Sequence, residues 1–225
     1  MATKKQETNG IEISIPPINK TETIITIIGD TPLIMNAFSE KAKRMILDKQ
    51  LQKAKKPKEA KNIWECFMNS LNWLTEKPTE FTQEAFEKAF NEGAKFGFPS
   101  IGVKASAIAA AYRAGLIKNM VCMQGAFHIP TEYVEIKGDI SMREDMVKIP
   151  MGGADVVFRG EFKNWYSTFT VTYNANRISL EQLIQLINLG GYEVGIGDWR
   201  VEKGGNHGMF HVATQDELKE LGLIE

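Results

Sequence analysis

The sequence has few of the residues from which disulfide frameworks, metal centres and membrane spans are built. Its 225 residues include two cysteines, Cys66 and Cys122, which share no metal-ligand spacing and predict buried, reduced thiols. No stretch approaches the roughly 20 apolar residues of a membrane-spanning helix. The polar N-terminus lacks the apolar core of a secretory signal. We therefore expect a cytoplasmic protein that does not associate with a membrane.

Catalytic motifs are also missing. Only three histidines occur, and two of them, His207 and His211, flank a predicted loop–strand junction without the further ligands that zinc requires. There is no Walker loop, dinucleotide fingerprint, nucleophile elbow or H-E-x-x-H motif. Asp30 has the chemistry for a metal or an acid–base step, although capping a turn is the commoner role there. We expect no cofactor, no metal and no enzymatic activity.

The net charge is −1, so the chain as a whole lacks the excess of positive charge that is usual in nucleic-acid-binding domains. Positive charge is concentrated between residues 41 and 61, where nine cations face two anions, Asp48 and Glu59. The nine are Lys41, Lys43, Arg44, Lys49, Lys53, Lys55, Lys56, Lys58 and Lys61. Like charges repel unless an anion is nearby, so the run predicts a surface that faces phosphates. A solvated helix face is the alternative.

The order of predicted elements favours an α+β fold with a ferredoxin-like β-α-β-β-α-β core. Strands are expected over 21–28, 126–129, 133–136, 147–149, 155–158, 166–173 and 209–213, and core helices over 103–114 and 179–189. In strand 166–173 we expect aromatic residues and valine to point inward and Ser/Thr outward. We also expect the strands over 21–28, 166–173 and 209–213 to share one antiparallel sheet. The open face of such a sheet is a common platform for single-stranded nucleic acid.

Four segments are predicted around this order. They are a flexible arm at 1–20, the core at 21–34 and 98–213, an inserted helical lobe at 35–97, and a C-terminal helix at 214–225. Within the lobe we expect helices that begin at Ser39, span 62–74 and run from Thr82 to Gly93. Capping boxes are predicted at Ser179 with Gln182 and at Thr214 with Glu217.

A glycine-rich stretch, Gly190 to Val212, follows the second core helix. Glycine allows positive φ and lets a partner approach the main chain closely. Trp199 offers a flat face for stacking, and donors and charge come from Arg200, Lys203 and His207. This combination suits a flat, anionic partner such as a nucleotide chain. The alternative is a loop that only turns the chain, with Trp199 in the core.

Three stretches carry a family resemblance. They are the strand and turn over 24–32, the stretch FPSIGVK at 98–104 leading to Tyr112 and Arg113, and the glycine-rich loop over 195–212. Together they resemble the RAMP superfamily, the ferredoxin-like RNA-binding proteins of CRISPR effector complexes, and especially their Cas7-like backbone subunits. The second stretch is similar to the family's IPGSSLKG…R entry to its first helix. The glycine spacing is wider here than in the family, and Asp198 adds an anion where the family favours cations.

The resemblance implies a protein that binds single-stranded nucleic acid, RNA rather than DNA, and assembles along it as a homo-oligomer or filament. The candidate binding residues are Lys41, Lys43, Arg44, Lys53, Lys55, Lys56, Lys104, Arg113, Gly195, Gly197, Trp199, Arg200, Lys203 and His207. Lys104 is included because the first turn of a helix attracts anions. Some relatives cleave RNA through a histidine without a metal, which makes His207 a residue to test. A phage structural, interaction or inhibitor protein that uses this fold without nucleic acid is the alternative.

Overall fold

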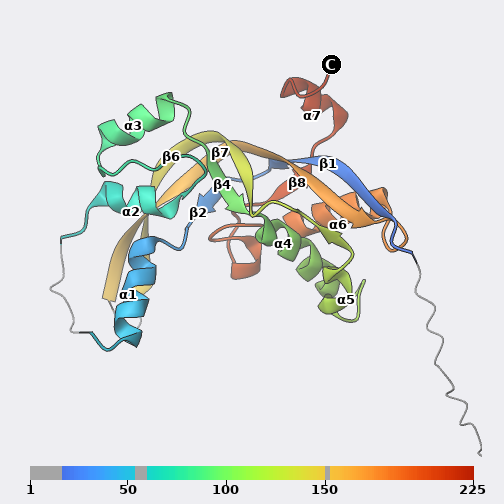
Figure 1. Cartoon of the computed structure of the whole chain (residues 1–225), viewed down its shortest axis with the longest axis horizontal. Helices are drawn as coiled ribbons and strands as arrows, with labels where there is room; N and C mark the ends of the chain where they lie inside the picture. Colours follow the sequence, from blue (N-terminus) through green and yellow to red (C-terminus); the bar gives the residue numbers. More distant parts are fainter. Residues whose placement is uncertain (1–16, 54–59, 150–152) are drawn as a thin grey trace, which may run out of the picture.

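A computed structural model describes residues 17–53, 60–149 and 153–225 and shows a mixed α+β protein with an antiparallel sheet, as predicted (Figure 1). The strands are β1 (Lys20–Gly29), β2 (Leu33–Met35), β3 (Asn72–Trp73), β4 (Phe96–Pro99), β5 (Phe127–His128), β6 (Tyr133–Ile149), β7 (Gly153–Asn174) and β8 (Phe210–Val212). The helices are α1 (Glu40–Gln50), α2 (Ile63–Ser70), α3 (Gln83–Asn91), α4 (Ser100–Arg113), α5 (Met120–Gln124), α6 (Leu180–Glu193) and α7 (Gln215–Glu220), with a 3₁₀ turn η1 (Val201–Lys203).

The sheet is organised around β7. Its strand order is β3-β4-β6-β7-β1-β8, and β2 and β5 also pair with β7. The first half of β7 pairs with β6 and the second half with β1, where Ile24 lies opposite Thr170. On its other edge β1 pairs with β8, where Ile28 lies opposite His211. The prediction that the first strand, the strand 166–173 and the last strand share one antiparallel sheet is therefore confirmed.

Two long strands replace four of the predicted short ones. β6 continues through the polar residues 137–146, which the hydrophobic pattern assigned to no strand. The pairing shifts register between Lys137 and Asp139, at Gly138 with φ 151°, so the hairpin bends there without ending. Further along, Arg143 on β6 forms ion pairs with Asp145 and with Glu161 on β7, so charged residues become paired within the ladder.

The helices α4 and α6 cover one face of β1 and β7, and α7 lies on the other side (Figure 1). α4 and α6 also pack closely against each other, since a Cβ added at Gly190 of α6 would lie 2.6 Å from the backbone nitrogen of Ala107 in α4. On β7 the predicted alternation holds from Thr168 to Val171 but is wrong at its start and at Thr172, which is buried. Ser167 is buried, whereas Tyr166 belongs to the outward set, opposite Ile28.

The segment 35–97 contains α1, α2 and α3 but also β3 and the start of β4, and these two strands extend the sheet from the edge of β6. α2 ends at Ser70 rather than near residue 74, because the Ser70 hydroxyl accepts a hydrogen bond from the backbone of Gly160 and the chain turns into β3. The expected burial of both cysteines is also wrong, since Cys122 is exposed. Among the helices of this segment, α2 and α3 have buried residues, whereas α1 has none.

Candidate nucleic-acid interface

The glycine-rich loop is shorter than predicted, because Gly190 and Gly191 are helical and buried in α6. The loop folds back onto β2 and the preceding turn. The backbone of Asp198 donates to the Ile34 carbonyl (2.9 Å), and that of Gly208 donates to the Pro32 carbonyl (2.9 Å). Gly197 has φ +80°, and a Cβ there would lie 2.5 Å from the Ile34 oxygen. Its conformational freedom therefore serves packing of the loop against its own chain.

Within this loop, Trp199 combines a positive φ with an exposed side chain. Its φ is +55°, and its carbonyl accepts a hydrogen bond from the backbone of His207 (3.2 Å). The indole is nevertheless 44% exposed, so the alternative that places Trp199 in the core is wrong. A bulky residue at positive φ is a steric outlier that costs on the order of 1–3 kcal/mol and persists only where its surroundings enforce it. The fold thus holds an aromatic ring at the surface.

Arg113 of α4 and Arg200 of the loop converge on one carboxylate, Glu202. Both guanidiniums lie 2.6 Å from its oxygens, and Arg200 also donates to the Gly197 carbonyl (3.2 Å). The hydrogen bond from Arg200 holds the pKa of Glu202 below its usual range, helped by the charge of both arginines and opposed by burial. This cluster borders a cavity of about 320 Å³ between α4 and the loop, lined mainly by small and apolar side chains. The two arginines therefore brace the loop.

Asp198 has an internal role. Its carboxylate lies 3.2 Å from the Arg159 guanidinium and accepts a hydrogen bond from the Asn36 amide (2.9 Å). Arg159 in turn lies 3.8 Å from Asp145 in the β6–β7 hairpin. The loop is thereby tied to β7, which explains an anion in a stretch that the sequence led us to regard as cationic.

The predicted cations between residues 41 and 53 are partly neutralised. Lys41 pairs with Glu65 (2.9 Å), Lys53 pairs with Asp48 (2.8 Å), and Lys43 pairs with Glu40. Arg44 is exposed, while Lys55 and Lys56 lie outside the described residues.

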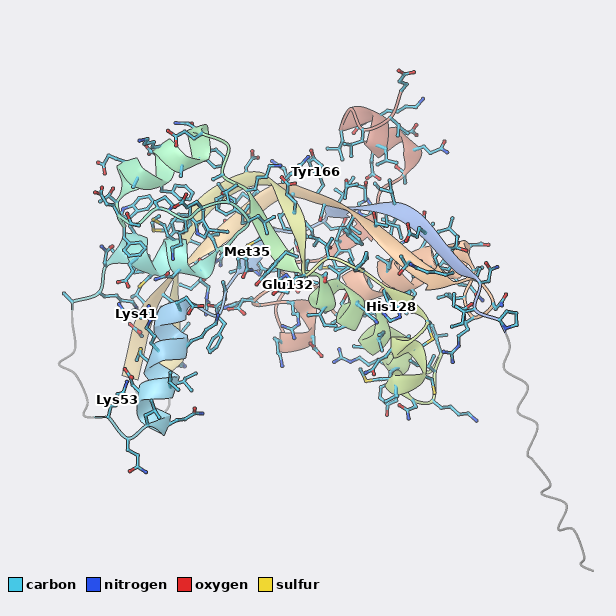
Figure 2. The ribbon with its side chains drawn as sticks, in the orientation of Figure 1. Met35, Lys41, Lys53, His128, Glu132 and Tyr166 are labelled. Atoms are coloured by element: carbon cyan, nitrogen blue, oxygen red, sulfur yellow. The ribbon has the colours of Figure 1, made fainter. Side chains whose placement is uncertain are left out.

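Lys104 is not brought together with the α1 cations. It donates to the Gln124 carbonyl (2.6 Å) and lies 3.3 Å from His128, which Figure 2 places far along the molecule from Lys41 and Lys53. Burial lowers the pKa of Lys104, and it also lowers the pKa of His128 together with the nearby ammonium.

The structure thus brings Gly195, Gly197 and Arg200 together around one cavity, and Arg113 pairs with Glu202 of the cavity wall. Lys203 is exposed in η1. The imidazole Nδ1 of His207 is buried and has no hydrogen-bond partner in the described part of the chain. No group of histidine, cysteine and acidic residues within 17–53, 60–149 and 153–225 is placed to hold a metal ion. No helix in these ranges is long and apolar enough to span a membrane.

The contacts within two groups of surface residues were not predicted from the sequence. The first is the open sheet face, where Lys137 lies 5.8 Å from the centre of the Tyr166 ring and Ile24 is 73% exposed. Alternation along β7 could have predicted this, because Tyr166 lies on the same face of the strand as Thr168 and Thr170.

The second group is a chain of ion pairs at the edge of the same face. His211 Nδ1 lies 2.7 Å from Asp30, and Nε2 lies 2.9 Å from Glu217 of α7. These residues are far apart in sequence, so the capping box alone did not reveal the contact.

We expect the His211 bridge to make stability depend on pH. Burial lowers the pKa of His211, but hydrogen bonds and charge from Asp30 and Glu217 outweigh it and leave the pKa raised. Stabilisation is then complete below the unfolded pKa of about 6.5 and is lost as the pH rises through the folded value. His211→Asn should cost about 0.5–1 kcal/mol at pH 6, as partly exposed pairs do, and less at pH 9. Urea unfolding at both pH values measures this, and an equal cost at each would rule out a charged bridge.

No protein-family model matches the chain, and no curated protein is significantly similar to it in sequence.

Proposed function

We propose that this protein binds single-stranded nucleic acid, RNA rather than DNA, in the cytoplasm, and that the glycine-rich loop is the base-stacking part of its interface. The observation that carries the proposal is Trp199, whose indole is 44% exposed on a backbone held at φ +55°. Strained residues of this kind cluster at ligand clamps and functional loops. A rigid, exposed aromatic face suits any nucleobase, because every base has a face on which it can stack.

The strand order supports this function. Without the peripheral strands, the sheet reads β6-β7-β1-β8, with α4 between β1 and β6 in the chain and α6 between β7 and β8. We infer that this is the ferredoxin-like core expected from the sequence, in which both helices lie on one face. The resemblance to the RAMP superfamily accords with it. The other face carries Tyr166 and is a second candidate platform.

The contacts divide the loop residues between binding and support. Arg200 and Arg113 are engaged by Glu202, so we assign them to positioning the loop. Lys203 is exposed at the end of η1, in the same loop as Trp199, and is the cation that we assign to a phosphate beside a stacked base. In this proposal Gly195 and Gly197 shape the loop, and the ligand runs past η1.

The test is a titration of labelled single-stranded RNA and DNA oligonucleotides by fluorescence anisotropy at several salt concentrations. We expect binding that weakens with salt and is stronger for RNA. Lys203→Gln should weaken binding to all sequences alike and reduce the slope of log K against log salt by about 0.7, the value for one phosphate contact on a single strand. Tyr166→Ala reports on the sheet face separately. Absence of binding to every oligonucleotide at low salt would refute the proposal.

A role as an interaction protein without nucleic acid is the second candidate. It is favoured by α1, which has no buried residue and exposes several large apolar side chains. The absorbance ratio at 260 and 280 nm of protein purified in low salt, before and after nuclease treatment, distinguishes the two functions. Bound nucleic acid raises this ratio, and nuclease treatment lowers it again.

A further inference from the structure

The helix α1 exposes a set of large apolar side chains. Its residues and their neighbours carry five large apolar side chains that are between 47% and 67% exposed, and no residue of the helix is buried. The five are Phe38, Met45, Ile46, Leu47 and Leu51. An isolated helix of 11 residues is marginal in water, and grouped exposed apolar residues mark interaction sites. The helix therefore needs a partner surface.

The positive charge of α1 indicates that its partner surface is negatively charged. From Glu40 to Lys53 the chain carries five cations against two anions. The matching surface is a groove of about 620 Å³ between residues 76–80 and α3. Segment 76–92 carries five glutamates against two lysines, the reverse of the α1 balance.

The two lysines of the groove do little to offset its negative charge. Lys77 turns inward, donates to the Asn69 side chain and lies 5.2 Å from the centre of the Phe81 ring. Lys88 lies 4.0 Å from Glu92, whereas Glu76, Glu80 and Glu84 are exposed. The acidic groove thus complements the helix that the same chain leaves uncovered.

We propose that two copies of this chain form a closed, two-fold dimer in which each α1 docks in the partner's acidic groove beside α3. Both surfaces lie at the same end of the molecule, with α3 on one side and α1 on the other (Figure 1). A two-fold rotation at that end brings each α1 opposite the other copy's α3. A two-fold interface is self-complementary, so both contacts form at once and the assembly closes at two chains. The exposed cations of α1 then serve assembly, and this inference stands apart from nucleic-acid binding.

The test is a charge-swap measurement by analytical ultracentrifugation of nuclease-treated full-length protein in low salt. We expect the wild type to dimerise. Arg44→Glu with Lys49→Glu, and separately Glu76→Lys with Glu80→Lys, should each raise the dimer dissociation constant at least tenfold. An equimolar mixture of the two variants should dimerise again, because in the mixed dimer the reversed α1 meets the reversed groove and the unchanged α1 meets the unchanged groove. Lys118→Glu with Lys219→Glu is the matched control and should dimerise as the wild type does.

Folding and geometry are checked independently. Leu47→Ser with Leu51→Ser removes exposed apolar groups at unchanged charge, so it should also weaken the dimer at least tenfold while leaving the melting temperature of the monomer unchanged. A wild type that stays monomeric at all concentrations, or variants that dimerise like it, would overturn the proposal. A mass that grows beyond two chains with concentration would replace the closed dimer by an open filament. Assembly only on added nucleic acid would likewise exclude the α1 contact as its cause.

Discussion

Replacing Trp199 by alanine is expected to weaken binding of single-stranded nucleic acid by roughly ten- to a hundredfold while leaving the melting temperature almost unchanged. A base stacked on an aromatic side chain contributes about 1–3 kcal/mol by alanine substitution. The indole is 44% exposed, so its removal opens no cavity in the core. An anisotropy titration and a thermal melt on the same preparation measure both quantities.

Two matched variants make this result specific to the ring. Trp199→Phe keeps an aromatic face and should retain most of the affinity. Trp199→Gly should bind as poorly as Trp199→Ala without loss of stability, because glycine adopts the φ of +55° without steric cost. A large fall in melting temperature for Trp199→Ala, with unchanged affinity, would show that the indole has a packing role and would exclude stacking.

Replacing Trp165 by alanine should have the largest effect on stability. The ring is fully buried, its indole nitrogen donates to the Thr31 carbonyl (2.8 Å), and it packs edge-on against Phe210 (6.2 Å). Truncating a buried tryptophan costs about 3–5 kcal/mol, a large part of the 5–15 kcal/mol that stabilises a typical protein. Equilibrium unfolding in urea gives this difference.

The substitution Trp165→Ala should also destabilise the end of the glycine-rich loop. Thr31 also accepts a hydrogen bond from the Met209 backbone (3.0 Å), and the neighbouring Pro32 carbonyl holds Gly208. Trp165→Phe retains most of the ring and loses the hydrogen bond to Thr31, so it should cost about 1–3 kcal/mol, less than alanine. An alanine variant as stable as wild type would mean that the turn and β8 do not depend on this ring.

What could be predicted from the sequence was local. Ser39, Thr82, Ser179 and Thr214 were predicted to cap helices, and each side chain accepts the expected backbone hydrogen bond. Helix caps and β-branched strands depend on residues only a few positions apart, so they can be recognised from the local sequence alone.

What could not be predicted depends on residues that meet only after folding. The middle of β6 looked too polar for a strand, because Glu161, which pairs with Arg143, lies 18 residues away. Asp198 is an anion in a loop expected to bind anions, and its partner Arg159 lies in a different part of the sequence. The sequence indicated candidate residues for the site but not their separate roles. Nothing in the local sequence shows that Glu202 forms ion pairs with both Arg113 and Arg200.

The position of β7 at the centre of the sheet has a consequence for synthesis. β1 is synthesised before its neighbours β7 and β8, so Ile24 meets Thr170 only after all the residues between them have been added. Pairings between such distant residues slow folding, because the entropy of closing the long intervening chain is lost before any contact forms. Until then the β-branched run of β1 is an unpaired edge, the kind of segment that joins other chains. During synthesis β1 is therefore the segment most open to pairing with strands of other chains until β7 is complete.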